Sequence, residues 1–162
     1  MTKLIIILVI IILVGFAIYY GRFFVTKKVV QEEIPIEMSG KNETGTSGST
    51  LNQEIRQGTF GEIDFIHKGK GVAKVLTDGG GKRFLRFEDF EVTNGPDLYV
   101  YLSPNPAPTK AKESLGKFIS LGRLKGNVGN QNYEVPPDAG NFESVVIWCR
   151  QFSALFSYAT LK

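Results

Sequence analysis

The stretch Asp97-Leu98-Tyr99-Val100-Tyr101-Leu102-Ser103 decides the fold class of this chain. Leu98, Val100 and Leu102 alternate with tyrosines, so an extended segment has one aliphatic face and one aromatic face. This period of two predicts a β-strand, because successive side chains of a strand point to opposite faces of the sheet. The preceding Asn94-Gly95-Pro96-Asp97 has the composition of a turn and sets the start of the strand.

Further segments of the chain show strand patterns separated by turn signals. The turn at 78–81, Asp-Gly-Gly-Gly, joins two of them as a hairpin, since glycine tolerates positive φ. With no long helical periodicity between the turns, the pattern predicts an all-β domain, an antiparallel β-sandwich or barrel of about eight strands. Besides 97–103, the expected strands are 62–65, 72–76, 82–87, 118–121, 131–135, 143–149 and 152–161.

An almost unbroken apolar run lies near the N-terminus; it starts at Leu4, ends at Tyr20 and is interrupted only by Gly15. Extended to Val25, it reaches the roughly 20 residues that cross a bilayer as a helix. The sequence therefore predicts one N-terminal transmembrane helix within residues 1–25, with the membrane as partner of residues 4–25. A cleaved signal peptide is the alternative, although the nearest small-x-small site lies inside the apolar run.

The charges that flank this run bear on its orientation. Lys3 and the amino terminus precede it, whereas Arg22, Lys27 and Lys28 follow it. Positive residues near a span prefer the cytoplasm, so a difference of about one charge favours an internal C-terminal domain. This signal is weak.

Residues 26–57 are expected to form a flexible polar linker between the anchor and a domain at 58–162. The middle of this linker, 39–50, contains no apolar side chain. Such a segment cannot bury enough surface to offset its ordering entropy, so its expected role is that of a tether.

Composition excludes several classes of function. The 162 residues carry a formal net charge of +3, with no basic run in the domain, which argues against a nucleic-acid partner. One cysteine and one histidine exclude an intramolecular disulfide, a type-1 copper site and a zinc site built from His and Cys alone. Without a Ser-His-Asp set or a nucleophile elbow, hydrolysis is not expected either.

Three blocks of the domain carry a family resemblance. They are FLRFEDFEVTNGPDLYVYLS at 84–103, LGRLKGNVGNQNY at 121–133 and SVVIWCRQF at 144–152. In this order they resemble the electron-transfer DM-thirteen domain family over about residues 58–161. The resemblance implies a β-sandwich module, usually extracytoplasmic and sometimes found beside DOMON and cytochrome-like domains. It also implies a redox role centred on the family cysteine, which here is Cys149.

The residues around Cys149 give two interpretations. Val145 and Ile147 share its strand face, and Val146 and Trp148 form the other, so both faces are apolar and the strand is expected to be central and buried. A buried free cysteine behaves as a small hydrophobe, which favours a structural thiol. A redox role needs access and a stabilised thiolate. Cys149 is therefore the redox candidate, and a packed thiol is the alternative.

Other chemistry-bearing residues have simpler interpretations. Trp148 is expected to be a core aromatic rather than an electron relay, and His67 a solvent-facing residue of a hairpin turn rather than a haem ligand. The acidic cluster, in which no loop has the ligand spacing of a calcium site, is expected to be a solvated strand edge. It comprises Glu88, Asp89, Glu91 and Asp97.

Two functions follow from the sequence. The first is a membrane-anchored accessory redox module that uses Cys149 and a redox or surface protein partner. The second is a non-catalytic binding or adhesion module whose loops at 104–108 and 126–132 hold a protein or small ligand. In either case an accessory module is expected rather than an independent enzyme, single-pass in the cell membrane. The usual location of the family places the domain outside the cytoplasm, and it outweighs a charge difference of about one. No cofactor is indicated.

Overall fold

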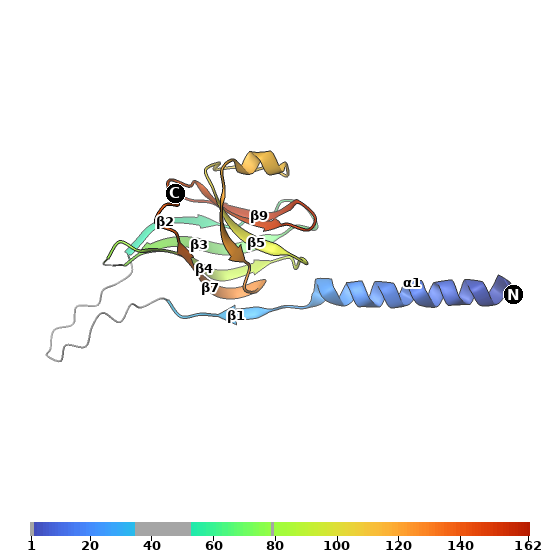
Figure 1. Ribbon diagram of the computed structural model, residues 1–162. Helices are drawn as coiled ribbons and strands as arrows, with labels where there is room; N and C mark the ends of the chain where they lie inside the picture. Colours follow the sequence, from blue (N-terminus) through green and yellow to red (C-terminus); the bar gives the residue numbers. More distant parts are fainter. Residues whose placement is uncertain (1, 35–52, 79) are drawn as a thin grey trace.

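The computed structural model describes residues 2–34, 53–78 and 80–162. Figure 1 shows two stacked β-sheets, with an N-terminal helix that leaves the β domain at one end. The described residues form the helix α1 (Thr2–Val25), nine strands and the short 3-10 helix η1 (Lys112–Leu115). The mostly β fold expected from the sequence is confirmed, and of the sandwich and the barrel that the sequence left open the structure has the two-sheet form.

The first sheet has five strands in the order β1-β7-β4-β3-β2. β1 pairs in parallel with β7, and the other neighbours are antiparallel. Its strands are β1 (Val29–Gln31), β2 (Gln53–Thr59), β3 (Gly69–Thr77), β4 (Arg83–Val92) and β7 (Val128–Val135).

The second sheet has four strands in the order β6-β5-β8-β9, all antiparallel. β8 is one of its two central strands, and all six of its residues are buried. The strands are β5 (Leu98–Ser103), β6 (Ile119–Arg123), β8 (Ser144–Cys149) and β9 (Ala154–Thr160).

Two apolar clusters cover the two faces of the second sheet. The larger lies between the sheets and includes Phe60, Phe87 and Phe90, whose rings pack with centroids 4.8–4.9 Å apart. The smaller lies on the outer face, where η1 and neighbouring loops cover it, and comprises Tyr101, Leu115, Val146, Trp148 and Leu155. Because both faces are buried, β8 reads as a continuous apolar run rather than an alternating one.

The structure corrects two sequence expectations about strands. Residues 62–65 were expected to form a strand but form part of a loop, because the Asp64 carboxylate accepts backbone hydrogen bonds from Ile66 and His67 and closes a turn. β1 lies inside the range 26–57 that was expected to be a linker, and β2 begins inside it at Gln53. Its apolar-free middle, 39–50, lies outside the described residues.

The apolar side chains of α1 between Leu4 and Tyr19 are exposed along the helix. Among the residues that the structure describes, no helix is both long and apolar enough to cross a membrane. The expected transmembrane helix is therefore not confirmed.

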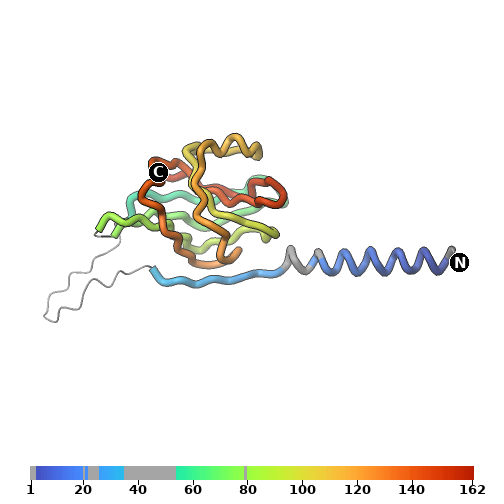
Figure 2. The backbone as a smooth tube through the Cα atoms, in the orientation of Figure 1, coloured from blue at the N-terminus to red at the C-terminus, as the bar shows by residue number. Residues whose placement is uncertain are grey.

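Residues 27–33, here called the strap, run along the edge of the first sheet (Figure 2). The strap pairs Val29, Val30 and Gln31 with residues 128–130 of β7. The backbone of Lys28 donates to Asn127 Oδ1 at 2.7 Å, and that of Glu32 donates to the Asn130 carbonyl at 2.9 Å. The segment that follows α1 is thus built into the sheet.

Candidate functional site

Cys149 is the last residue of β8, between two partner strands. It lies opposite Leu98 on β5 and Ala154 on β9. Its side chain is 0% exposed and belongs to the cluster between the sheets, together with Val145 and Ile147. The expectation of a central, buried strand is confirmed.

Full burial defines the chemistry of the thiol in this conformation. A cysteine reacts as its thiolate and needs contact with its reaction partner, and an apolar, closed environment disfavours both. In the folded domain Cys149 packs as a small apolar side chain. Any reaction at its sulfur requires an opening of the structure around the end of β8.

Arg150, the cationic residue next to Cys149 in the sequence, has its guanidinium over the ring of Tyr99. The Arg150 guanidinium carbon lies 4.6 Å from the centroid of the Tyr99 ring, and Arg123 lies over the same ring at 5.7 Å. Arg123 also pairs with Asp97. Tyr99 packs against the outer cluster, whereas Cys149 belongs to the cluster between the sheets. The guanidinium thus lies with the outer face, as alternation along a strand requires.

The turn that follows Cys149 contains a strained backbone position. Ser153 has φ 47°, a left-handed conformation that non-glycine residues seldom adopt. The register of β8 and β9 also shifts between Ile147 and Trp148. The sheet is therefore irregular on either side of Cys149, which makes this hairpin end a place where local opening would expose the thiol.

Trp148 is 1% exposed and packs in the outer cluster. In the same cluster Tyr101 stacks on Phe118 with ring centroids 4.4 Å apart. Burial raises the pKa of the Tyr101 hydroxyl above its ordinary value. Trp148 thus has the core position that the sequence predicted.

His67 is half-buried rather than solvent-facing, which corrects the sequence expectation. Its Nδ1 lies 2.9 Å from Asp64 Oδ2, and its ring packs against that of Phe156 at 4.5 Å. Hydrogen bonds from His67 and then from the Lys110 ammonium hold the pKa of the Asp64 carboxyl well below its usual range. His67 thereby fixes the loop at 61–68 to β9.

The acidic cluster is divided among separate ion pairs. Glu88 pairs with Lys74, Glu91 with Lys27 and Lys70, and Asp97 with Arg123. Within the part of the chain that the structure describes, no three His, Cys, Asp or Glu side chains gather where they could hold a metal ion.

The two segments that were expected to be ligand-binding loops are both contacted by other parts of the chain. The segment at 126–132 is not a loop beyond residue 127, because β7 begins at Val128, and the strap covers it. The Asn132 backbone donates to Glu32 Oε2 at 2.8 Å, and Asn132 Nδ2 donates to the Glu33 carbonyl at 2.6 Å. The loop at 104–108 is held by side chains of the neighbouring strands, since Ser144 Oγ donates to the Asn105 carbonyl and Thr160 Oγ1 to that of Pro106, both at 2.6 Å.

A hollow of about 520 Å³ lies between the strap and β3. Lys27, Lys68 and Lys70 line it, with Glu62 and Glu91 as counter-charges. Sequence reasoning missed this lysine group, because Lys27 is far along the chain from the other two and no local pattern joins them.

Comparison with known proteins gives one match. The family model described as Electron transfer DM13 matches residues 59–161. Neither the curated proteins nor the solved structures gave a match. The matched range begins at the last residue of β2 and ends after β9, so α1 and the strap lie outside it.

Proposed function

The chain belongs to the electron transfer DM13 family, and from this premise we propose that it is a membrane-attached accessory module in electron transfer. The observation that carries the proposal is the family match over residues 59–161, which contains the second sheet and the strands β3, β4 and β7 of the first. Cys149 is the only cysteine of the chain, and it is the residue that we assign to the redox role.

A single thiol restricts the chemistry. The chain cannot form a disulfide within one molecule, so a thiol-based role requires a second thiol or disulfide on a redox partner protein. Because Cys149 is 0% exposed, the partner must meet it in a state in which the end of β8 and the turn at 150–153 have opened. The strained φ of Ser153 is the reason why we place the local opening at this turn.

Attachment to a membrane rests on α1. Its exposed aliphatic side chains include Leu4 at 79% and Ile18 at 61%, and a helix that is apolar all round is typical of a lipid environment. We assign the domain to the extracytoplasmic side on the usual location of the family. The weak charge asymmetry around the apolar run opposes this assignment, so the orientation needs its own test.

The orientation test uses Glu134, whose side chain is 63% exposed. Glu134→Cys in the full chain should react with a membrane-impermeant maleimide added to intact cells, since the buried Cys149 contributes little background. Reaction only after lysis would place the domain inside the cytoplasm.

The redox role is tested on the detergent-solubilised full chain with glutathione disulfide as the probe. Attack by the Cys149 thiolate on glutathione disulfide forms a mixed disulfide and releases one glutathione thiolate. Mass spectrometry of the protein detects the mixed disulfide. We expect the adduct to form faster than global unfolding allows and to be absent in Cys149→Ala. Adduct formation only in denaturant would refute a redox role for Cys149.

A second function, a non-catalytic binding module, is favoured by one specific observation. Cys149 lies inside the cluster between the sheets, with no exposed atom, as a purely structural thiol would. Under this alternative, Cys149→Ala retains partner binding, and the folded chain gives no adduct with glutathione disulfide.

A further inference from the structure

We infer that the end of the β domain that carries Phe65 docks on the lipid headgroup surface beside α1. This inference rests on the membrane attachment proposed above and goes beyond it. It gives the domain a fixed orientation on the bilayer, where the sequence suggested a module held at a distance by a tether.

The first argument is an apolar loop tip that the fold holds in place. Phe65 is 85% exposed and Ile66 49%, and they are consecutive in the loop at 61–68. The loop does not collapse over them, because Thr93 Oγ1 donates to the Ile66 carbonyl at 2.8 Å and the Ile63 backbone donates to the His67 carbonyl at 2.9 Å. Adjacent large apolar side chains presented to water by an ordered loop mark a contact surface.

A third apolar side chain lies at this end of the domain. Phe152, in the turn between β8 and β9, is 58% exposed, and Figure 1 shows this turn at the end from which α1 leaves. The turn and the Phe65 loop are linked through Phe156 near the start of β9, whose ring contacts His67. Two loops thus present aromatic side chains on one side of the molecule.

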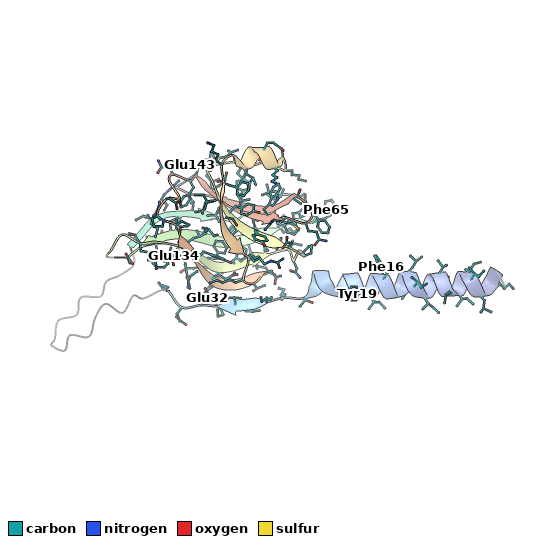
Figure 3. The ribbon with its side chains drawn as sticks, in the orientation of Figure 1. Phe16, Tyr19, Glu32, Phe65, Glu134 and Glu143 are labelled. Atoms are coloured by element: carbon teal, nitrogen blue, oxygen red, sulfur yellow. The ribbon has the colours of Figure 1, made fainter. Side chains whose placement is uncertain are left out.

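The strap supplies the second argument, because it fixes where the helix leaves the domain. Only residues 26–28 separate α1 from β1, and β1 is held in register on β7. Three extended residues span about 10 Å at most, so the helix end stays close to the domain. Figure 3 shows Phe65 at the end of the domain from which α1 leaves, with Glu134 and Glu143 toward the opposite end. A bilayer that holds α1 therefore lies next to the Phe65 loop.

Charge supplies the third argument and indicates the lipid. The hollow at this end is lined by the ammonium groups of Lys27, Lys68 and Lys70 against two glutamates. Lys70 and Lys27 share Glu91, at 3.0 and 2.6 Å, so this group has an excess of cations. Beside exposed aromatic side chains, a cationic group suits an interface with anionic headgroups.

The experiment places a bimane fluorophore on Phe65→Cys in the full chain, reconstituted in vesicles of phosphatidylcholine and phosphatidylglycerol. Nitroxide carried on the lipid headgroup is the quencher. The matched control is bimane on Glu134→Cys, at the opposite end. We expect several-fold stronger quenching at position 65 than at 134, and a smaller difference in vesicles of phosphatidylcholine alone. Both substitutions are at exposed positions, and thermal melting verifies that each variant folds.

Flotation of the wild-type chain with the vesicles separates the two proposals. If the chain floats but the label at 65 is quenched no more than the label at 134, docking is refuted while membrane attachment stands. If the label at 65 is shielded from water yet not quenched by lipid, a second copy of the chain covers this surface, and docking is again refuted. If the chain does not float, attachment and docking are both refuted.

Discussion

Gly129 of β7 and Val30 of the strap approach so closely that a Cβ on Gly129 would lie 2.0 Å from the Val30 carbonyl oxygen. Gly126 makes a similar approach, with 2.4 Å from an added Cβ to the Lys28 carbonyl oxygen. The parallel pairing of β1 with β7 thus depends on two glycines that leave room for the backbone of the strap. Both belong to the sequence block at 121–133.

Replacement of Gly129 should therefore release the strap. In Gly129→Ala the new methyl group overlaps the Val30 backbone, so β1 separates from β7. Hydrogen exchange at the Glu32 amide, which donates to Asn130, should accelerate at least about tenfold, as a loss of about 1.4 kcal/mol in local opening free energy implies.

The control for this change is Gly122→Ala. Gly122 has φ +102°, close to the +104° of Gly129, but nothing lies within 4 Å of an added Cβ. In both variants an alanine must adopt a positive φ, which costs about 1–2 kcal/mol. Only in Gly129→Ala does the new methyl group also collide with the Val30 backbone. Equal exchange rates at Glu32 in the two variants would show that the strap does not depend on this contact.

A second prediction concerns acid stability and Asp64. Its pKa is lowered in the folded state by hydrogen bonds from His67 and then Lys110, so the carboxylate stabilises the fold at pH values above its ordinary pKa of about 4. This contribution is lost as the pH falls below that value toward the folded-state pKa. Urea unfolding should show a stability that drops between about pH 5 and about pH 2 in the wild type, and less so in Asp64→Asn. Asp138→Asn, at an exposed position, is the control and should retain the wild-type slope.

Tyr133 leads to a third prediction, because it belongs to a buried polar network under the strap. Its hydroxyl donates to Gln131 Oε1 at 2.8 Å and accepts from the Lys125 backbone at 3.1 Å. Gln131 is 0% exposed and donates to the Gly126 carbonyl at 2.7 Å, which holds the loop that receives the strap. Burial raises the pKa of Tyr133 well above its usual value, so the hydroxyl stays protonated and able to donate.

Tyr133→Phe should lower the free energy of unfolding by about 1–2 kcal/mol, since it leaves buried polar groups with fewer partners. Chemical denaturation of the full chain measures this loss. Tyr158→Phe removes a hydroxyl from a partly buried tyrosine outside the network and should cost less. A larger loss in Tyr158→Phe would mean that the network contributes little to stability.

The sequence was sufficient for those parts of the fold that rest on local patterns. Alternation placed Leu98, Val100 and Leu102 on one face of a strand, and all three pack between the sheets. The two apolar faces around Cys149 likewise predicted its burial. In both cases burial of a strand face requires apolar residues on that face, so the apolar pattern of the sequence predicts which face is buried.

Other parts depend on long-range contacts that leave no local pattern. β2 has a mostly polar sequence, and its Arg56 donates to the carbonyls of Phe142 and Leu161, far along the chain. β1 has only three residues and forms because glycines distant in sequence admit it. The alternation at 62–65 was misleading, since the Asp64 side chain satisfies backbone groups that a strand would have paired with a neighbour.

The last prediction concerns Cys149 and separates its two interpretations. As a packed thiol, it should tolerate Cys149→Ala at a cost of about 1–2 kcal/mol in the free energy of unfolding, a modest effect of a smaller core side chain. Cys149→Ser should cost more, because it places a hydroxyl among the apolar side chains between the sheets. As a redox thiol, it should label in the folded chain, and Cys149→Ala should abolish electron transfer while stability barely changes. Maleimide labelling at neutral pH, compared with the unfolding rate of the same sample, decides between them. Its position inside the sheet is what a packed thiol requires, so labelling no faster than global unfolding would establish that interpretation. Labelling faster than global unfolding would support the redox role that we propose for Cys149.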